Sequence, residues 1–242
     1  MINLALFGAS GKMGRAVIEE ANKDPSIHIS NYIVRNNSEN LGIDVGEFHF
    51  SEALNKFFLA APENEFDCII DFATRDDVDK RIEFYSEIKK PLLFCTTGLS
   101  DQQIEKLKLL SNDLPIFIAP NTSILTALMR NLLGKIKKVK DNYEIKLTEK
   151  HHESKIDAPS GTAIDLAGAL NFDVANIESI REGNEGNWHK ALIFNGFEEL
   201  ELKHSAPKRS IYAQGALNIV KWFYQKPKNL YYMQTLIEDL YE

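Results

Sequence analysis

The segment HHESKIDAPSGTA, residues 151–163, contains the side chains best suited to chemistry in this sequence. It is too polar for a protein core, and it runs into an apolar pattern, AIDLAGAL, that is typical of a helix. We expect Ser160 to cap that helix, so that the amides of Gly161 and Thr162 and the positive end of the helix dipole face a carboxylate. These three residues are therefore candidates for binding an anionic substrate.

Positive charge and transferable protons come from three further side chains of this segment. Lys155, His151 and His152 each supply a cation or a proton donor beside the expected start of the helix. Asp157 is placed to fix the loop or to orient Lys155, and Pro159 stiffens the entry to the helix. Such a site would hold a small acid with at least one carboxylate and hand it a proton.

Two other interpretations of the segment are a metal site and a solvated loop. Adjacent histidines on a strand point to opposite faces, so His151 and His152 would seldom bind one ion. The sequence places no cysteine or further histidine nearby to complete a zinc site. We therefore predict no metal, and we prefer the anion site to the solvated loop.

A second candidate site is the glycine-rich stretch GASGKMG, which contains Gly8, Gly11 and Gly14. It follows an apolar run at residues 2–9 and opens a helical pattern at residues 13–22. Glycines there let the backbone approach a pyrophosphate, whose charge then rests on the helix amides. The spacing is G-x-x-G-x-x-G instead of the commoner G-x-G-x-x-G, and a tight turn without a ligand is the alternative. Its place at the first strand–helix junction favours dinucleotide binding.

The end of the second predicted strand, residues 26–35, indicates which dinucleotide binds. An acidic side chain there would bind the ribose hydroxyls of NAD. The strand instead ends in IVRNNS, without a carboxylate, and Arg35 could face the 2′-phosphate of NADPH. An arginine that is simply solvated is the alternative. The sequence therefore favours NADPH and leaves NADH open.

Three more strand ends carry candidate cofactor residues. Phe72 closes the strand at 66–73, CTTG (95–98) closes the strand at 91–98, and APNTS (119–123) closes the strand at 114–121. Ligands of open α/β sheets lie over the carboxyl ends of the strands, so these loops should face the nicotinamide end of the cofactor.

Alternating strands and helices organise the first half of the chain. Apolar strands at the positions above alternate with helical patterns at 13–22, 75–90 and 100–112, the last opened by a capping box from Ser100 to Gln103. This alternation predicts a doubly wound parallel, Rossmann-type sheet.

The pattern changes after residue 122. A long helix at 123–140 is followed by strand-like runs that start at residues 143, 177, 189 and 198, and by helices at 161–170 and 215–223. We expect an α+β unit with a mixed or antiparallel sheet. The predicted domains are a dinucleotide-binding domain (1–122 and 216–242) and a substrate-binding and oligomerisation domain (123–215).

The composition narrows the classes of partner. Lys plus Arg number 28 against 35 Asp plus Glu, and this acidic balance argues against nucleic acid as a main partner. No stretch is apolar enough to span a membrane, and the N-terminus has no basic leader. Cys68 and Cys95 both lie in apolar runs, as expected of free thiols in the cytoplasm.

EKHHESKIDAPSGTA resembles the signature of the 4-hydroxy-tetrahydrodipicolinate reductase (dihydrodipicolinate reductase) family: two histidines, a lysine three positions on, then D-A-P-S-G-T-A. GASGKMGRA, the DF and TTG strand ends and RSIYAQGAL also resemble this family, over nearly the whole chain. The resemblance implies NADH- or NADPH-dependent reduction of the cyclic imine dicarboxylate formed from 4-hydroxy-tetrahydrodipicolinate, in lysine and diaminopimelate biosynthesis. It also implies a homotetramer built through the sheet of the second domain, with a C-terminus that returns to the first.

The resemblance also implies residue roles. His151 matches the proton donor/acceptor of the family and Lys155 its proton donor, while His152, Gly161 and Thr162 match its substrate-binding positions. With Ser160 added to the substrate residues and Phe72 to the cofactor residues, the candidate cofactor set is Gly8, Ala9, Ser10, Gly11, Lys12, Met13, Arg35, Phe72, Cys95, Thr96, Thr97, Ala119, Pro120, Asn121 and Thr122.

Two departures from the family pattern concern the cofactor site. Many members carry Glu where Val34 stands, which weakens the case for NADH, and many carry Gly where Cys95 stands, which crowds that loop. Two rival functions follow from the same features. A regulatory module that binds NAD(P)H and senses a metabolite without turnover would have no need for Lys155. A dehydrogenase of another small acid would keep that lysine but lack D-A-P-S-G-T.

Overall fold

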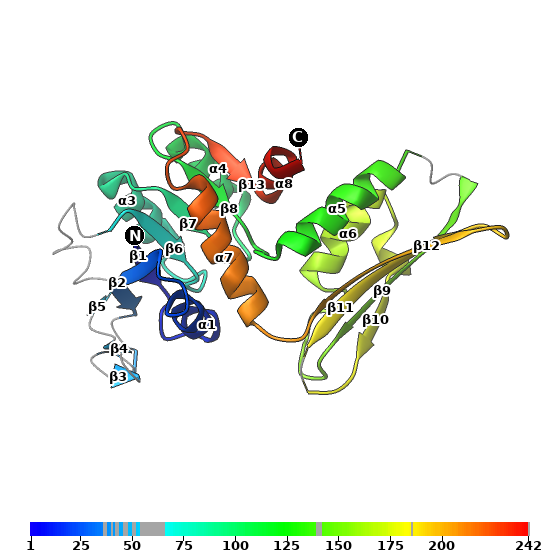
Figure 1. Cartoon of the computed structure of the whole chain (residues 1–242), viewed down its shortest axis with the longest axis horizontal. Coiled ribbons are helices and arrows are strands. Elements are labelled where there is room, and N and C mark those ends of the chain that lie inside the picture. The colour runs from blue at the N-terminus through cyan, green and yellow to red at the C-terminus, as the bar shows by residue number, and fades with distance from the viewer. Residues whose placement is uncertain are drawn as a thin grey trace. The chain divides into compact units, whose positions relative to one another are not determined.

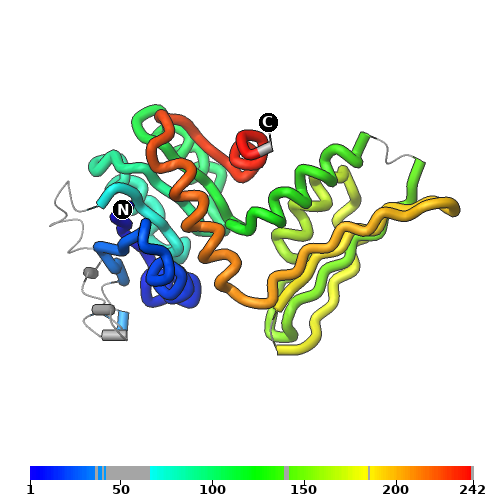
Figure 2. Tube along the Cα trace, viewed as in Figure 1, coloured from blue at the N-terminus to red at the C-terminus, as the bar shows by residue number. Residues whose placement is uncertain are grey.

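A computed structural model of the chain describes residues 1–35, 38–39, 41, 44–45, 48–49, 52–53, 66–138, 142–184 and 186–241. The chain forms two compact units, Met1–Thr122 with Tyr212–Leu236, and Ser123–Ile211 with Ile237–Glu242. It returns to the first unit at Tyr212, slightly before the expected residue 216, and this return is the orange part of the trace in Figure 2. The last residues, from Ile237 on, group with the second unit. The functions assigned to the two units stay predictions.

The first unit is built on a parallel sheet, as predicted. In the described part of the chain its strands run in the order β13-β8-β7-β6-β1-β2-β5, and every neighbouring pair is parallel. Apart from the partly exposed Asn3 of β1, the central strands are buried, as expected where helices cover both faces of a sheet. The strands are β1 (Ile2–Phe7), β2 (Ile27–Val34), β5 (Glu52–Ala53), β6 (Cys68–Asp71), β7 (Leu92–Phe94), β8 (Ile116–Ile118) and β13 (Leu230–Tyr232).

Helices pack on both faces of this sheet (Figure 1). In β8, Ile116 and Ile118 join the core cluster that contains Leu107 of α4, whereas the ring of Phe117 lies 5.8 Å from that of Phe223 in α7. Alternate residues of one strand therefore meet different helices, which confirms the doubly wound class. The helices of this unit are α1 (Lys12–Ala21), α3 (Val78–Ile88), α4 (Asp101–Leu110) and α7 (Ser210–Phe223). α8 (Met233–Tyr241) follows β13, and its residues from Ile237 on group with the second unit.

Helix boundaries follow the sequence signals where those signals are local. The capping box that was predicted before α4 is present, because the Ser100 side chain accepts from the Gln103 amide and the Gln103 side chain accepts in return from the Ser100 amide. α7 starts at Ser210 instead of residue 215, and the short strands β3 (Asp44–Val45) and β4 (Phe48–His49) were not predicted.

The second unit has the mixed sheet that was predicted, in the order β10-β9-β11-β12. β9 and β10 are parallel, and the other two pairs are antiparallel. α5 and α6 lie along one face of this sheet, where Leu133, Leu166 and Leu147 share a core (Figure 1). The elements are α5 (Ile124–Ile136), β9 (Glu144–His151), α6 (Gly161–Leu170), a 3₁₀ turn (Val174–Asn176), β10 (Glu178–Arg181), β11 (Asn187–Phe194) and β12 (Glu199–Ala206).

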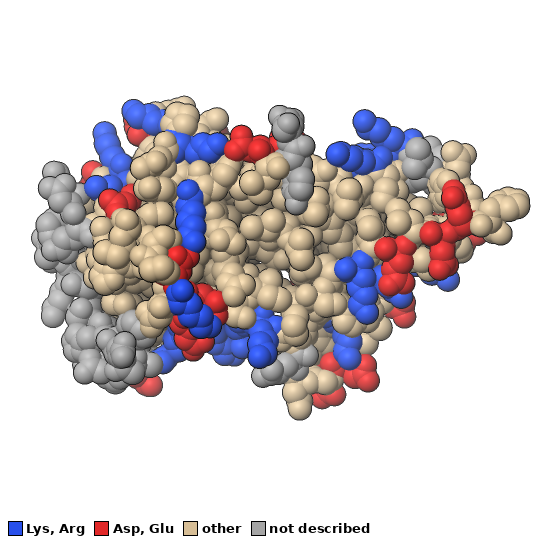
Figure 3. All heavy atoms as spheres, in the orientation of Figure 1, with Lys and Arg blue, Asp and Glu red and all other residues tan. Residues whose placement is uncertain are grey.

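Charged side chains of both signs lie on the surface of the described residues. On the face seen in Figure 3, basic and acidic side chains are interspersed, so the described residues of that face form no continuous basic surface. Within the described ranges, no helix is both long enough and apolar enough to cross a bilayer. α5, predicted over 123–140, ends at Ile136, and residues 139–141 lie outside the described part.

Candidate active site

The glycine-rich loop turns sharply between β1 and α1. Gly8 has a φ of +76°, and a Cβ built there would lie 2.7 Å from the carbonyl oxygen of Phe72. A Cβ on Gly14 would lie 2.3 Å from the carbonyl oxygen of Gly8. Both contacts are with backbone atoms, which cannot move away as the end of a flexible side chain could. These positions therefore need glycine whether or not a ligand binds.

The start of α1 offers free backbone amides to an anion. Gly11 caps the helix without a side-chain hydrogen bond, and no acidic residue stands in the first turn. A cavity of about 120 Å³ opens beside this turn, and its lining includes five predicted cofactor residues: Gly8, Ser10, Gly11, Arg35 and Phe72. A glycine cradle, a helix N-terminus and a cation together fit the diphosphate and ribose of a dinucleotide.

Arg35 follows β2 at the rim of this cavity, and Asp76 is an acidic neighbour of its guanidinium among the residues that the structure describes. Nη1 of Arg35 lies 3.9 Å from Oδ2 of Asp76, and both side chains are exposed. A 2′-phosphate at Arg35 would therefore also meet the negative charge of Asp76. Asn36 and Asn37, which complete the IVRNNS strand end, lie outside the described residues.

The remaining predicted cofactor residues differ in how accessible their side chains are. Thr96 turns inward, with Oγ1 3.2 Å from Asp71 Oδ1, and Thr122 donates to the carbonyl of Tyr212. Burial raises the pKa of the Cys95 thiol, so that it stays protonated. Buried side chains belong to Ala9, Cys95, Thr96, Ala119 and Thr122, whereas Lys12, Met13, Thr97, Pro120 and Asn121 are at least partly exposed.

A buried ion pair beneath the cavity was not predicted. Asp71, at the carboxyl end of β6, accepts from Nε of Arg81 at 2.9 Å and from the hydroxyl of Tyr85 at 2.8 Å. Arg81 also donates to the backbone carbonyls of Thr74 and Asp76. This network fixes the loop after β6, which carries Phe72 and lines the cavity.

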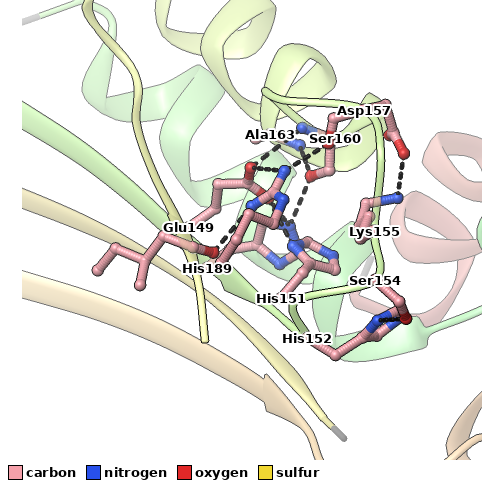
Figure 4. A network of polar contacts seen from close by, with 11 residues as sticks. Glu149, His151, His152, Ser154, Lys155, Asp157, Ser160, Ala163 and His189 are labelled. Carbon is pink, nitrogen blue, oxygen red and sulfur yellow. Dashed lines mark hydrogen bonds and ion pairs between the residues drawn. The ribbon is translucent and has the colours of Figure 1, made fainter. Parts of the chain in front are cut away.

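In the second unit, Ser160 begins α6 as predicted. Its hydroxyl accepts from the Ala163 amide at 3.2 Å, and its side chain is almost fully buried (Figure 4). A Cβ on Gly161 would meet nothing within 4 Å. The cap therefore leaves the first turn of α6, with Gly161 and Thr162, facing outward at the positive end of the helix.

The two adjacent histidines point in different directions, as expected from strand geometry. His151 is buried, whereas His152 is partly exposed and its Nδ1 lies 2.8 Å from Ser154 Oγ (Figure 4). Lys155 Nζ lies 2.8 Å from Asp157 Oδ1. This contact is the one that Asp157 would make if it orients Lys155, which was one of its two predicted roles. The structure thus places Lys155, His151 and the α6 terminus in one segment of the second unit.

Glu149 is the central residue that the sequence analysis missed. It is fully buried on β9, and Oε1 accepts from the Ser160 amide at 3.2 Å and from Nη2 of Arg181 at 2.8 Å. Oε2 lies 2.6 Å from Nδ1 of His151. Burial alone would raise the pKa of Glu149, but the hydrogen bonds from Ser160 and Arg181 outweigh it and lower the pKa to about 2.

His189 of β11 completes this cluster. Its Nε2 lies 3.2 Å from Ser160 Oγ, and its ring packs edge-on against that of His151 with centroids 5.3 Å apart. Burial, followed by the neighbouring His151, lowers the pKa of His189 to about 4, so the ring is neutral at pH 7. The pKa of His151 is also lowered, chiefly by burial and against the attraction of Glu149.

Glu149, His151 and His189 offer three possible metal-ligand atoms within 4.8 Å of one another. A metal site at this cluster therefore has to be considered. Ligand atoms on a tetrahedral zinc ion stand roughly 3.4 Å apart, as follows from bonds of about 2.1 Å. The 2.6 Å between Glu149 Oε2 and His151 Nδ1 is much shorter. Arg181 already supplies a cation to the same carboxylate, so the cluster has the geometry of an ion pair.

Comparisons with known proteins match both units. A family described as "Dihydrodipicolinate reductase, N-terminus" matches residues 2–122, and one described as "Dihydrodipicolinate reductase, C-terminus" matches residues 125–237. A 4-hydroxy-tetrahydrodipicolinate reductase of Buchnera aphidicola subsp. Baizongia pistaciae is 33% identical over 93% of each chain. One of Campylobacter fetus subsp. fetus is 32% identical over 96% of this chain and 97% of its own.

Solved structures share the fold. A dipicolinate-bound dihydrodipicolinate reductase from Paenisporosarcina sp. TG-14 aligns with a TM-score of 0.80 at 20% identity, over 96% of this chain and 97% of that one. A diaminopimelate dehydrogenase of C. glutamicum aligns with a TM-score of 0.56 at 10% identity, over 96% of this chain and 93% of that one. At these identities the likeness concerns the fold alone.

Proposed function

The chain belongs to the dihydrodipicolinate reductase family, and from that premise we propose which of its residues carry out the reaction. The family consists of pyridine-nucleotide-dependent reductases of lysine and diaminopimelate biosynthesis. The reaction is the reduction of the cyclic imine dicarboxylate derived from 4-hydroxy-tetrahydrodipicolinate to tetrahydrodipicolinate. It needs one hydride, one proton and a site for two carboxylates.

The first unit is proposed to bind the nucleotide. The amides of Lys12 and Met13 at the start of α1 would hold the pyrophosphate, since the Gly11 amide already donates to the carbonyl of Gly8, and Arg35 would bind a 2′-phosphate. The preferred cofactor is therefore NADPH, with NADH accepted as well. The loops at 95–97 and 119–122, together with Phe72, would hold the nicotinamide ring, which supplies the hydride when it is bound. The inward-turned hydroxyls of Thr96 and Thr122 leave mainly backbone groups for that contact.

The second unit is proposed to bind the dicarboxylate. The exposed first turn of α6 presents the amides of Gly161 and Thr162 and a partial positive charge, behind the cap that Ser160 makes. His152 and Lys155 add side-chain donors next to this turn. The substrate is thereby oriented by its carboxylates, while its ring stays free to accept the hydride.

Lys155 is the proposed proton donor. Its side chain is partly buried, with 23% exposed, and Nζ lies 2.8 Å from Oδ1 of Asp157. A cation beside the substrate carboxylates both binds them and delivers a proton as the hydride arrives. His151 is the proposed proton donor/acceptor that works with Lys155. No metal has a part in this proposal, because the 2.6 Å between Glu149 Oε2 and His151 Nδ1 is too short for two ligand atoms of one ion.

We further propose a homotetramer assembled through the face of the mixed sheet opposite to α5 and α6. On β11 the buried residues Ala191 and Ile193 alternate with the partly exposed Trp188, Leu192 and Phe194. The same face carries Lys190, and Lys146 and Lys203 lie over the rings of Phe194 and Trp188, so these large apolar side chains stand among charged ones. The proposed subunit contact would bury both kinds of side chain. Light scattering on the purified protein would give the mass. Both cysteines are free thiols, which supports a cytoplasmic location.

The observation that carries the proposal is the capped terminus of α6 with Lys155 and His151 in the segment that leads into it. A decisive experiment supplies NADPH deuterated at the transferred position, together with substrate generated from pyruvate and aspartate semialdehyde by the preceding synthase. One deuterium should appear in tetrahydrodipicolinate, measured by mass spectrometry. Cofactor binding without deuterium transfer would favour the metabolite sensor.

A further inference from the structure

We infer that Glu149 is a positioning residue for the proposed reaction: it orients His151, sets which nitrogen of that ring carries a proton, and ties the ring to the start of α6. The inference rests on the proposed role of His151. Glu149 itself is fully buried, so it acts through its neighbours and not on the substrate.

The placement of Glu149 follows from strand geometry. Residues two apart on a strand point to the same face, so Glu149 and His151 lie side by side on β9. The register of the sheet places Ser179 of β10 and His189 of β11 opposite Glu149. The carboxylate is thus enclosed by both neighbouring strands and by the turn that starts α6.

The two oxygens of Glu149 face different groups, and Oε2 makes a close contact with Nδ1 of His151 that lacks hydrogen-bond geometry. Oε1 accepts from the Ser160 amide and from Arg181, whereas Oε2 lies 2.6 Å from Nδ1 of His151. Arg181 also donates to the carbonyl oxygen of Asp157, whose side chain holds Lys155. One buried carboxylate therefore links both proposed proton-transfer residues to the proposed substrate-binding turn (Figure 4).

A carboxylate stays charged in a protein interior only where neighbouring groups compensate its charge, so the partners of Glu149 must all be in place. The carboxylate has the guanidinium of Arg181, an amide donor and an imidazole as partners, and removal of its charge would leave Arg181 uncompensated. The charged groups that face His151 are Glu149 from its own strand, Lys155 from the following loop and Arg181 from β10, with the titratable ring of His189 from β11. Glu149 supplies the negative charge in this set.

The chemical consequence concerns the tautomer of His151. A carboxylate at Nδ1 favours the form that carries its proton there, which leaves Nε2 to exchange a proton with the substrate or with Lys155. The same carboxylate stabilises the imidazolium once it forms. This is how a buried acid orients a catalytic histidine elsewhere in protein chemistry.

The experiment compares Glu149→Gln with wild type in two measurements. NMR of the His151 ring, assigned against His151→Gln, should give a pKa that is lower by roughly one unit or more in Glu149→Gln. The limb of the kcat/KM profile that depends on His151 should move to lower pH by the same amount. We expect kcat to fall about 10- to 100-fold, with Kd for NADPH unchanged. Glu149→Asp, which keeps the charge, should restore part of the loss.

Glu182→Gln is the matched control, because Glu182 is an exposed acid directly after β10 that pairs with Lys150. It should leave the His151 pKa and the pH profile unchanged. A folded Glu149→Gln variant with an unaltered His151 pKa and pH profile would overturn the inference and reduce Glu149 to a packing residue.

A second measurement needs no variant of Glu149. The ¹⁵N shifts of His151 in the wild-type protein should identify the tautomer protonated on Nδ1, and a tautomer protonated on Nε2 would overturn the inference even if Glu149→Gln does not fold. Because this test needs no turnover, it is distinct from a failure of the proposed function, which would appear as no deuterium transfer by wild type.

Discussion

Lys155 Nζ lies 2.8 Å from Asp157 Oδ1, and the aspartate is the more exposed of the two. The hydrogen bond from Lys155 holds the pKa of Asp157 below its usual value, so the pair is charged at neutral pH. The backbone carbonyl of the same aspartate accepts from Arg181. The loop that carries the proposed proton donor is therefore anchored to β10 by its own backbone.

Removal of the Lys155 ammonium should slow the reaction without harming cofactor binding. For Lys155→Ala we expect turnover to fall by about 10²- to 10⁴-fold, the usual loss for a missing general acid. The Kd for NADPH should stay within a factor of about two, because the cofactor residues lie in the other unit. Steady-state rates and fluorescence titration would measure the two quantities.

Lys150→Ala is the control for the loss of a lysine from this region, since Lys150 lies on β9 and pairs with Glu182. It should retain nearly full turnover. Equal losses in NADPH affinity and turnover for Lys155→Ala would mean that Lys155 has been placed wrongly.

Arg35 and Asp76 should have opposite effects on cofactor preference. Arg35→Ala should weaken NADPH binding roughly tenfold and NADH binding much less, because only NADPH has a phosphate for the guanidinium. Asp76→Asn should tighten NADPH binding, since it removes a negative charge 3.9 Å from that guanidinium. Titration with both cofactors gives the ratio. Unchanged NADPH affinity in Arg35→Ala would leave Arg35 as a solvated surface residue.

The role of the glycine-rich loop can be tested by comparing Gly8→Ala with an alanine substitution at a glycine where a Cβ meets no other atom. A Cβ on Gly8 would collide with the Phe72 carbonyl at a positive φ, so Gly8→Ala should lose most NADPH affinity and lower Tm. Gly134, inside α5, has nothing within 4 Å of an added Cβ. Gly134→Ala should therefore gain about 0.5–1 kcal/mol. If Gly8→Ala bound NADPH normally, the turn would not be the pyrophosphate cradle.

His189 should make the folded protein sensitive to acid. Its pKa is lowered to about 4, chiefly by burial. Below pH 6.5 the imidazole is therefore protonated in the unfolded chain, whereas in the folded chain it stays neutral until the pH falls to about 4. Stability is therefore lost as the pH falls through that window, by about 2 kcal/mol between pH 7 and pH 5 for this residue.

Urea unfolding at the two pH values measures this loss, and His189→Gln should reduce it while keeping a polar atom near Ser160. His151 and His204 contribute with the same sign, since burial lowers the pKa of each. An identical pH dependence in wild type and His189→Gln would show that His189 is charged in the folded state at pH 5.

The sequence predicted the elements whose signals are local. Buried runs such as the one that ends at Phe7, the Ser100 capping box and the Ser160 cap all appear as expected. β13 was not predicted, because three residues are too few to show a strand pattern. It forms because Tyr231 pairs with Phe117, far away in the sequence.

The buried charged residues are the main part of the site that could not be predicted from the sequence. Glu149 stands in a strand that reads EIKLTEKH, where a glutamate is expected to face solvent. Its burial depends on Arg181, whose position is known only once β10 pairs with β9. Asp71 and Arg81 are a similar case. The Glu-x-His spacing of Glu149 and His151, which puts both on one strand face, was the available signal.

The initial rate of NADPH oxidation, in the presence of the synthase with pyruvate and aspartate semialdehyde, tests the central claim most directly. The account predicts oxidation that stops when either precursor is omitted, is faster with NADPH than with NADH, and is lost in Lys155→Ala. NADPH that binds but is not oxidised when both precursors are present would contradict it.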